Sequence, residues 1–351
     1  MVEDGCVAGV TIQKLAKLAG VSLATVSRSL NTPHLVSPAT LAKVQQVIRE
    51  NDYVYKAMGR TLPKRRGSVI GVIIPSPSIS VFASTLIGIQ EVAFHKGYSL
   101  MVANTNYDAA TEYHQLRQMQ EQRVAGIIIA GYDMLNETLV LDIMKNGTPV
   151  MVMWDKVTHI PVNYVAIDNF RGAYASTDHC LRLGHTRIGA LICVFSCNSR
   201  TRERLEGYQA ALADHGIEYD PSLVISKKPT LVAGKEAAMR FLAMDSTPSA
   251  IICGGDHLAI GAMSVLSAAG KSVPDDISIC GFDDVEMASY CQPSLTTIRV
   301  PCPEIGRLSM ELLLEVIEQN DGQLRRCTLD TDLVIRRSCS RYTHKEGSQM
   351  V

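Results

Sequence analysis

The chain has 351 residues, too many for one small hydrophobic core, so we expect two or three domains. Its ten cysteines include no Cys-x2-Cys pair, and there is neither a secretory leader nor an apolar run of about 18 residues. These features argue against a zinc protein, a secreted disulfide-rich protein and a membrane protein. We expect a cytoplasmic protein with reduced thiols and no metal or cofactor.

The formal net charge of −1 is unevenly distributed. Residues 1–66 carry ten Lys and Arg against four acidic residues, a net charge of +6, which leaves −7 for the rest of the chain. Chance clustering is one explanation. The other is a basic module that binds a polyanion, joined to a soluble sensor.

Residues 11–31 contain two short helical patterns joined by a turn centred on Gly20. One face of each pattern is apolar, formed by Leu15, Ala16, Ala19, Val21, Val26 and Leu30. Ser22 suits the N-cap of the second helix, where its hydroxyl and nearby amides could also hold a phosphate. The pattern predicts a helix-turn-helix whose second helix enters the major groove of DNA. The alternative is a plain helical hairpin packed in a core.

A third helix is expected after Ser37 and Pro38, since Leu41, Val44, Val47 and Ile48 repeat at helical spacing to about residue 51. It would complete a DNA-binding headpiece over residues 1–52. Residues 53–67 are basic and contain little that could form a core. They are interpreted as a hinge or linker.

From residue 68 onward, short β-branched runs alternate with helical segments, which is typical of a parallel α/β architecture. The predicted strands are 69–75, 99–104, 126–129, 150–154, 165–167, 188–193, 223–226, 250–253 and 278–281. The predicted helices are 82–95, 110–122, 136–146, 171–183, 202–215, 231–244, 257–269 and 304–319. The segment is long enough for two similar lobes, and open α/β sheets bind ligands outside the carboxyl ends of their strands.

Several motifs, weak singly but specific in this order, resemble the lactose-repressor/galactose-repressor (LacI/GalR) family of bacterial transcription regulators along essentially the whole chain. They are residues 15–31 with Val36-Ser37-Pro38, then Ile70-Gly71-Val72, Asp168-Asn169, residues 183–188, Arg204-Leu205-Glu206-Gly207-Tyr208, residues 273–278, Gly281-Phe282-Asp283 and residues 293–298. The resemblance implies an all-α helix-turn-helix headpiece followed by a periplasmic-binding-protein-like (type I) core of two Rossmann-like lobes.

The resemblance also implies that the chain crosses between the lobes near Asp168, after Thr297-Ile298 and near Thr328. The N-terminal lobe would comprise about 68–166 plus 299–326, and the C-terminal lobe about 167–298 plus 327–340, leaving a polar tail at 341–351. The tail has no leucine heptad, so a homodimer rather than a tetramer is expected.

In the headpiece, the resemblance places Leu23, Ala24 and Arg28 where such proteins read base edges. Arg28 can reach guanine O6 and N7; the alternative is a solvated surface charge. Leu62 matches the hinge leucine that wedges into a base step from the minor groove, or else packs within an ordinary linker. The full predicted DNA-binding set is Thr11, Ser22, Leu23, Ala24, Thr25, Ser27, Arg28, Asn31 and Leu62.

The hinge departs from the family pattern, because Tyr55 replaces the common Pro and Gly59 falls within the expected hinge helix. A helix this short is marginal, and a Gly costs it about 1 kcal/mol relative to Ala. We therefore expect residues 56–62 to lack a stable helix in the absence of operator DNA.

In the core, the resemblance places Asp168, Arg204 and Asp283 at effector-binding positions, unless they form a structural ion-pair network. Phe82 matches an aromatic that lines the site or packs in the core, and Trp154 with Asp155 could add stacking. Gly255-Asp256 stands where the family often has Asn-Asp, which puts the ligand's identity in doubt. The predicted effector-binding residues are Phe82, Trp154, Asp168, Arg204, Asp256 and Asp283.

These observations predict a non-enzymatic transcriptional repressor that binds double-stranded palindromic operator DNA as a homodimer, under the control of a sugar or sugar derivative. The Gly-x-Ser-x-Gly, Gly-x-Gly-x-x-Gly and Gly-x4-Gly-Lys-Ser/Thr motifs are missing from the sequence, which argues against an α/β enzyme. A regulator that has lost its ligand response is the main alternative. A solute-binding protein is a weaker one, because it would not need a basic head.

Overall fold

The computed structural model describes residues 11–51, 67–131, 134–193 and 199–343. The chain divides into two compact units, with the division between Arg65 and Arg66. The expectations about Leu62 and about a missing helix at residues 56–62 fall outside the described residues. Among the described helices, none is long and apolar enough to cross a lipid bilayer.

The first unit contains helices α1 (Ile12–Ala19), α2 (Leu23–Asn31) and α3 (Pro38–Glu50), with a 3-10 turn, η1 (Pro33–Leu35), before α3. Thr11 and Ser22 cap the first two helices, accepting hydrogen bonds from the amides of Lys14 and Thr25. Gly20 ends α1 with φ of 59°, a left-handed conformation that suits glycine. The three helices enclose a small core of Leu15, Ala16, Ala19, Val26 and Val44.

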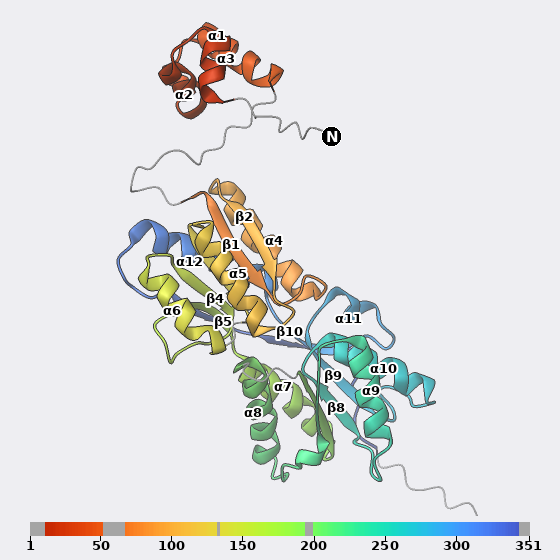
Figure 1. Cartoon of the computed structure of the whole chain (residues 1–351). Coiled ribbons are helices and arrows are strands. Elements are labelled where there is room, and N and C mark those ends of the chain that lie inside the picture. Colours follow the sequence, from red (N-terminus) through yellow and green to blue (C-terminus); the bar gives the residue numbers. More distant parts are fainter. Residues whose placement is uncertain (1–10, 52–66, 132–133, 194–198, 344–351) are drawn as a thin grey trace, which may run out of the picture. The chain divides into compact units, whose positions relative to one another are not determined.

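The second unit contains two six-stranded sheets (Figure 1). The first sheet has the order β11-β5-β4-β3-β1-β2, and all its strand pairs are parallel. Its strands are β1 (Val69–Ile74), β2 (Ser99–Asn104), β3 (Gly126–Ala130), β4 (Val150–Trp154), β5 (Asn163–Ile167) and β11 (Arg326–Leu329). The central strands β3 and β4 are buried along their whole length, as expected of a parallel sheet covered on both faces.

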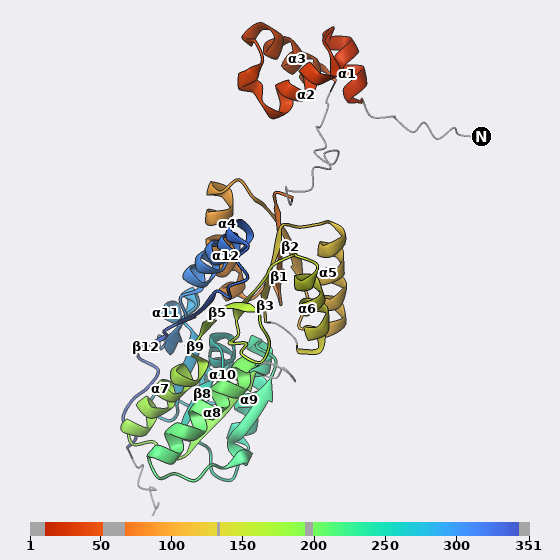
Figure 2. The same ribbon diagram turned by 90° about the vertical axis from the view of Figure 1, so that its left-hand side faces the viewer.

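Helices cover both faces of this sheet, and we call the whole assembly the first lobe. Figure 2 shows α4 (Ser80–His95) and α12 (Cys302–Gln319) on one face and α5 (Ala109–Glu121) and α6 (Glu137–Lys145), which follows η2 (Met134–Asn136), on the other. Gly88 and Gly306 allow α4 and α12 to pack at backbone contact, because a Cβ at either position would overlap a carbonyl oxygen of the facing helix.

The second sheet has the order β12-β10-β9-β8-β6-β7, and only the edge strand β12 is antiparallel to its neighbour. Its strands are β6 (Ile188–Cys193), β7 (Val224–Lys227), β8 (Ala250–Cys253), β9 (Ser278–Asp283), β10 (Thr296–Arg299) and β12 (Asp332–Val334). One face is covered by α7 (Asn169–Arg182) and α8 (Ser199–Asp214) and the other by α9 (Leu231–Leu242) and α10 (Asp256–Ala268) (Figure 1). With η3 (Pro221–Leu223) and α11 (Glu286–Tyr290), they form the second lobe.

The chain passes between the two sheets three times. It leaves β5 at Ile167 for the second lobe, returns after β10 at Arg299, and leaves again after β11 at Leu329. Thr328 therefore lies within β11, which belongs to the first lobe. The segment 327–340 that we assigned to the second lobe thus begins a few residues before the chain enters that lobe. The predicted fold class, two α/β lobes preceded by an all-α headpiece, is confirmed.

Candidate functional site

Most of the described DNA-binding candidates of the first unit lie on α2 or at its N-cap, and Thr11 lies at the N-cap of α1. Leu23, Ala24 and Arg28 are exposed, whereas Val26 on the opposite side is buried. The Ser22 hydroxyl is 2.9 Å from that of Thr25 and accepts a hydrogen bond from the Thr25 amide, which fixes the start of the helix. Thr25 and Ser27 are half-buried, and Thr11 is exposed at the start of α1. Asn31 is the last residue of α2.

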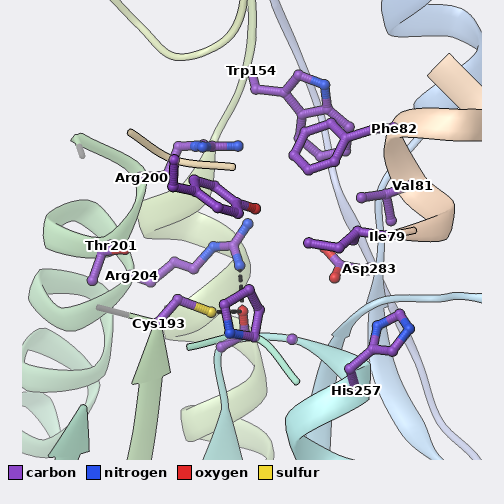
Figure 3. Close-up of a pocket in the computed structure, with 14 residues that line it drawn as sticks. Ile79, Val81, Phe82, Trp154, Cys193, Arg200, Thr201, Arg204, His257 and Asp283 are labelled. Carbon is purple, nitrogen blue, oxygen red and sulfur yellow. Dashed lines mark hydrogen bonds between the residues drawn. The ribbon is translucent and has the colours of Figure 1, made fainter. Parts of the chain in front are cut away.

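The second unit contains a pocket lined by residues of both lobes (Figure 3). The first lobe contributes Ile79, Val81, Phe82, Tyr107 and Trp154, and the second contributes Cys193, Arg200, Thr201, Arg204, Pro229, Gly254, Gly255, His257 and Asp283. Trp154, Cys193 and Asp283 are the last residues of β4, β6 and β9. The pocket therefore lies at the carboxyl ends of the strands, where open α/β folds bind ligands.

Arg204 is held in the pocket by three contacts. Its Nε donates to Oδ1 of Asn169 at 2.9 Å, and its Nη1 donates to the carbonyl oxygen of Gly254 at 2.7 Å. Its guanidinium lies over the Phe282 ring, 3.6 Å from the centroid. Burial lowers the pKa of Arg204, and the nearby Asp283 opposes this shift. The arrangement presents a pre-positioned cation to whatever fills the pocket.

Arg200 lies one turn before Arg204 on α8 and pairs with a buried carboxylate. Its Nε is 3.4 Å from Oδ1 of Asp155, and the Ser199 hydroxyl donates to the same oxygen at 2.7 Å. Burial raises the pKa of Asp155, and the charge of Arg200 opposes this shift. Asp155 thus forms an ion pair with Arg200, whereas we expected Asp155 to add stacking contacts beside Trp154.

Asp283 brings a carboxylate to the pocket in a strained backbone conformation, with φ of 118°. Burial raises its pKa to about 6, although Arg204 and then Arg200 oppose the shift. Burial also raises the pKa of the Cys193 thiol to about 11, so this side chain is a neutral thiol that donates to the Gly254 carbonyl at 3.3 Å. The pocket can accept hydrogen bonds at Asp283 and donate them from Arg204.

Phe82 and Trp154 form the apolar wall of the pocket from the first lobe. Their ring centroids are 5.6 Å apart in an edge-to-face arrangement, and both side chains are buried. Among the described residues, Trp154 Nε1 and Asp155 Oδ2 are buried polar atoms without a hydrogen-bond partner. The indole N–H of Trp154 is therefore available to donate a hydrogen bond to an acceptor atom of a ligand.

Two of the predicted effector-binding residues lie elsewhere. Asp168 caps α7, accepting from the Arg171 amide at 2.8 Å. Asp256 is fully buried and accepts from the Val285 amide at 2.8 Å and the Thr297 hydroxyl at 2.6 Å. In the part of the chain that the structure describes, neither lines the pocket, whereas Phe82, Trp154, Arg204 and Asp283 all do.

Sequence reasoning missed several residues that line the pocket, chiefly Tyr107, Cys193, Arg200, Thr201 and His257. The spacing of four residues between Arg200 and Arg204 was a usable signal, since it puts both side chains on one helical face. Cys193 ends a predicted strand and could have been found by the same rule as Asp283. No group of three or more His, Cys, Asp or Glu within the described ranges could hold a metal ion.

A headpiece that exposes the start of its second helix, and a bilobed α/β unit with a pocket between its sheets, define a ligand-binding regulator of transcription as the class of protein. Residues 11–55 match the model of the bacterial regulatory proteins, lacI family, and residues 67–337 match that of the periplasmic binding proteins and sugar binding domain of the LacI family. The chain belongs to the lacI family of bacterial regulatory proteins.

Individual relatives agree with this assignment. The HTH-type transcriptional repressor PurR of Photobacterium profundum is 33% identical over 329 residues, which cover 93% of this chain and 98% of the relative. The lac repressor dimer bound to operator and the anti-inducer ONPF has a TM-score of 0.81 at 25% identity, covering 95% of this chain and 100% of that chain. The transcriptional regulator CelR–cellobiose complex has a TM-score of 0.71 at 28% identity, covering 94% and 99%.

The chain is therefore a DNA-binding transcriptional repressor with an effector-binding domain, and its family consists of regulators rather than enzymes.

Proposed function

We propose that this repressor acts in the cytoplasm as a homodimer on a palindromic operator, and that a sugar or sugar derivative bound in the pocket controls its operator affinity. The observation that carries the proposal is the presence of both Arg204 and Asp283 in a pocket that also has an aromatic wall, Phe82 and Trp154.

The chemistry of this pocket suits a polyhydroxylated ligand. A sugar offers hydroxyls that donate to a carboxylate such as Asp283 and accept from a guanidinium such as Arg204. It also has C–H faces that pack against aromatic rings like those of Phe82 and Trp154. A solved relative contains cellobiose, and the matched family model is described as a sugar binding domain.

Control of operator binding follows if the ligand binds one arrangement of the lobes better than another. Because the pocket is lined from both lobes, a ligand that contacts Phe82 and Arg204 together favours the arrangement in which both reach it. A differential binding energy of about 1–3 kcal/mol changes operator affinity by about 5- to 150-fold. The dimer of the lac repressor bound to operator supports the proposed assembly.

In the headpiece, the exposed side chains of Leu23 and Ala24 at the start of α2, and of Arg28 in its last turn, are proposed to face base edges in the major groove. Thr11, Ser22, Thr25, Ser27 and Asn31 are proposed to contact phosphates, and Leu62 to enter the minor groove. Such contacts make operator binding steeply dependent on salt.

Titration calorimetry of the full chain against cellobiose, monosaccharides, other disaccharides and sugar acids tests the effector. A ligand that binds should also change affinity for an operator selected from random DNA, measured by fluorescence anisotropy. Arg204→Met should abolish ligand binding, whereas Arg202→Met, which removes an exposed charge from the same helix, should leave it intact. If every sugar fails while selective operator binding persists, the repressor does not respond to sugars and this part of the proposal is wrong.

A further inference from the structure

A carboxylate of the first lobe contacts the second lobe beside the pocket. Asp155 directly follows β4 in the first lobe, whereas Ser199 and Arg200 are the first two residues of α8 in the second. The Arg200 Nε lies 3.4 Å from Oδ1 of Asp155, and the Ser199 hydroxyl donates to the same oxygen at 2.7 Å. These contacts join the lobes directly, in addition to the three segments of chain that cross between them.

The Arg200 side chain meets the first lobe at a second place. Gly131 directly follows β3, the neighbour of β4 in the sheet, and has a left-handed backbone with φ of 72°. A Cβ at Gly131 would lie only 2.9 Å from Nη2 of Arg200, so the guanidinium occupies the space that a side chain would fill there. Arg200 therefore packs against the loops that follow two adjacent strands of the first lobe.

The contact between Asp155 and Arg200 is shielded from solvent. Their side chains are only 3% and 10% exposed, so dissolved salt screens the attraction little. The carboxylate also lies at the amino-terminal end of α8, where the helix dipole favours a negative charge. Because a buried charge is costly without its partner, this pair stabilises the one relative orientation of the lobes in which both groups meet.

We propose that Asp155 and Arg200, the inter-lobe pair, hold the two lobes together around the pocket before any effector binds. Asp155 is a positioning residue, because it pairs with Arg200, which lines the pocket, while within the described chain Asp155 is not itself part of the lining. The inter-lobe pair does not depend on which effector the pocket binds. Its consequence for DNA, a change in operator affinity when the pair is broken, rests on the proposed function.

The single tryptophan of the chain, Trp154, reports on the inter-lobe pair. It precedes Asp155, is buried, and lines the pocket from the first lobe, so separation of the lobes should expose its indole. Acrylamide quenching of its fluorescence is measured without effector in the unmodified full chain, in Asp155→Asn and in Arg200→Met. We expect the quenching constant to rise several-fold in both variants. An unchanged constant in either variant would overturn the proposal.

The double variant Asp155→Asn/Arg200→Met tests whether the two side chains act as a pair. Asparagine keeps an oxygen that can accept from the Ser199 hydroxyl, and the double variant contains neither buried charge. Its quenching constant should not exceed the larger of the two single-variant values, because one contact can be lost only once. Additive effects would show that the residues act independently and would contradict the proposal. Should Arg200→Met fail to fold in a urea titration, Asp155→Asn still decides the question.

Glu112→Gln is the matched control, because Glu112 is also a buried carboxylate of the first lobe but accepts from Asn136 of the same lobe at 2.9 Å. It should leave the quenching constant unchanged. In anisotropy measurements without effector, Asp155→Asn and Arg200→Met should shift the Kd for the selected operator by at least about fivefold. A raised quenching constant with an unchanged operator Kd would support the inter-lobe pair and refute the proposed control of operator binding, so the two proposals fail separately.

Discussion

The pKa of the buried Asp256 carboxyl can be tested directly by substitution. Its carboxylate is fully buried at the start of α10, where Oδ2 accepts from the Val285 amide and Oδ1 from the Thr297 hydroxyl. Asparagine at this position can keep both contacts, with its oxygen accepting from the amide and its NH2 donating to the hydroxyl oxygen. Asp256→Asn therefore removes the titration while preserving shape and hydrogen bonding.

Burial, and then the charge of Asp283, raise the pKa of Asp256 from 3.8 to about 8. The folded state thus binds this proton more tightly than the unfolded state, so the free energy of unfolding falls as the pH rises from about 4 to about 8. A difference of about four pKa units corresponds to an upper limit of about 5 kcal/mol. The pKa values of the buried His185 and the half-buried His257 are lowered, which acts on the free energy of unfolding in the opposite direction, but both histidines are present in the unmodified chain and in the variant alike.

The free energy of unfolding is measured by urea denaturation at about pH 5 and about pH 9, in the unmodified chain and in Asp256→Asn. Trp154, the single tryptophan, is buried in the second unit and reports on its unfolding by fluorescence. From the lower to the higher pH, the free energy of unfolding of the unmodified protein should fall by several kcal/mol more than that of Asp256→Asn. Asp275→Asn, which removes an exposed carboxylate, should behave like the unmodified protein. If the unmodified protein and Asp256→Asn show the same pH dependence to within about 1 kcal/mol, Asp256 is ionised in the folded state and the reasoning fails.

Three further predictions concern the pocket, the headpiece and the fold. Phe282→Leu removes the ring beneath Arg204, and calorimetry should show effector binding weakened by about 2- to 30-fold, corresponding to roughly 0.5–2 kcal/mol of cation–π interaction. An unchanged Kd would mean that the stacking does not position Arg204. Arg28→Ala should weaken binding to the selected operator by about 1–3 kcal/mol in anisotropy measurements, with little loss on scrambled DNA. Equal loss on both DNAs would instead assign Arg28 to a phosphate. Gly306→Ala places a Cβ against the Thr85 carbonyl and should destabilise the second unit by about 1–3 kcal/mol, seen as a lower midpoint of Trp154 fluorescence; an unchanged midpoint would show that α4 and α12 can separate without cost.

The sequence allowed most of the α/β alternation to be predicted, because runs such as Val69–Ile74 are continuous stretches of β-branched and other apolar residues that only a covered strand accommodates. It did not predict β10, β11, β12 or the short helix α11 as elements. β11 and β12 carry arginine, threonine and aspartate at sheet edges, where the pattern of burial is too weak to detect. Their pairing depends on the crossings between the lobes, which local sequence does not encode.

Residues of the site were predictable where a charged side chain lies at the end of a strand or the start of a helix. Arg204 and Asp283 combine a charged side chain with the beginning of a helix or the end of a strand, and both line the pocket. Asp168 and Asp256 satisfy the same rule yet serve as a helix cap and a buried acceptor. Whether a carboxylate at a strand end points into the cleft or back toward the backbone depends on the loop that follows, and the residue type does not encode it.

Strained backbone conformations occur in the pocket and in the loop that follows β9. Trp154, Asp283 and Asp284 have φ values of 75°, 118° and 56°, a conformation that costs about 1–3 kcal/mol for each such residue unless the surroundings enforce it. For Asp284 the enforcing groups are Arg299 and Arg336, which lie 2.7 and 2.6 Å from its two carboxylate oxygens.

These two arginines tie the strained loop to the segments that connect the lobes. Arg299 is the last residue of β10, directly before the chain returns to the first lobe, and Arg336 follows β12, directly after the chain enters the second lobe for the last time. A ligand that displaces Asp283 also moves its neighbour Asp284. Because Asp284 is paired with Arg299 and Arg336, this displacement acts on segments next to two of the three crossings. We therefore expect the Asp283 carboxylate to be the shortest physical connection, through the segments that join the lobes, between ligand binding in the pocket and the relative orientation of the lobes.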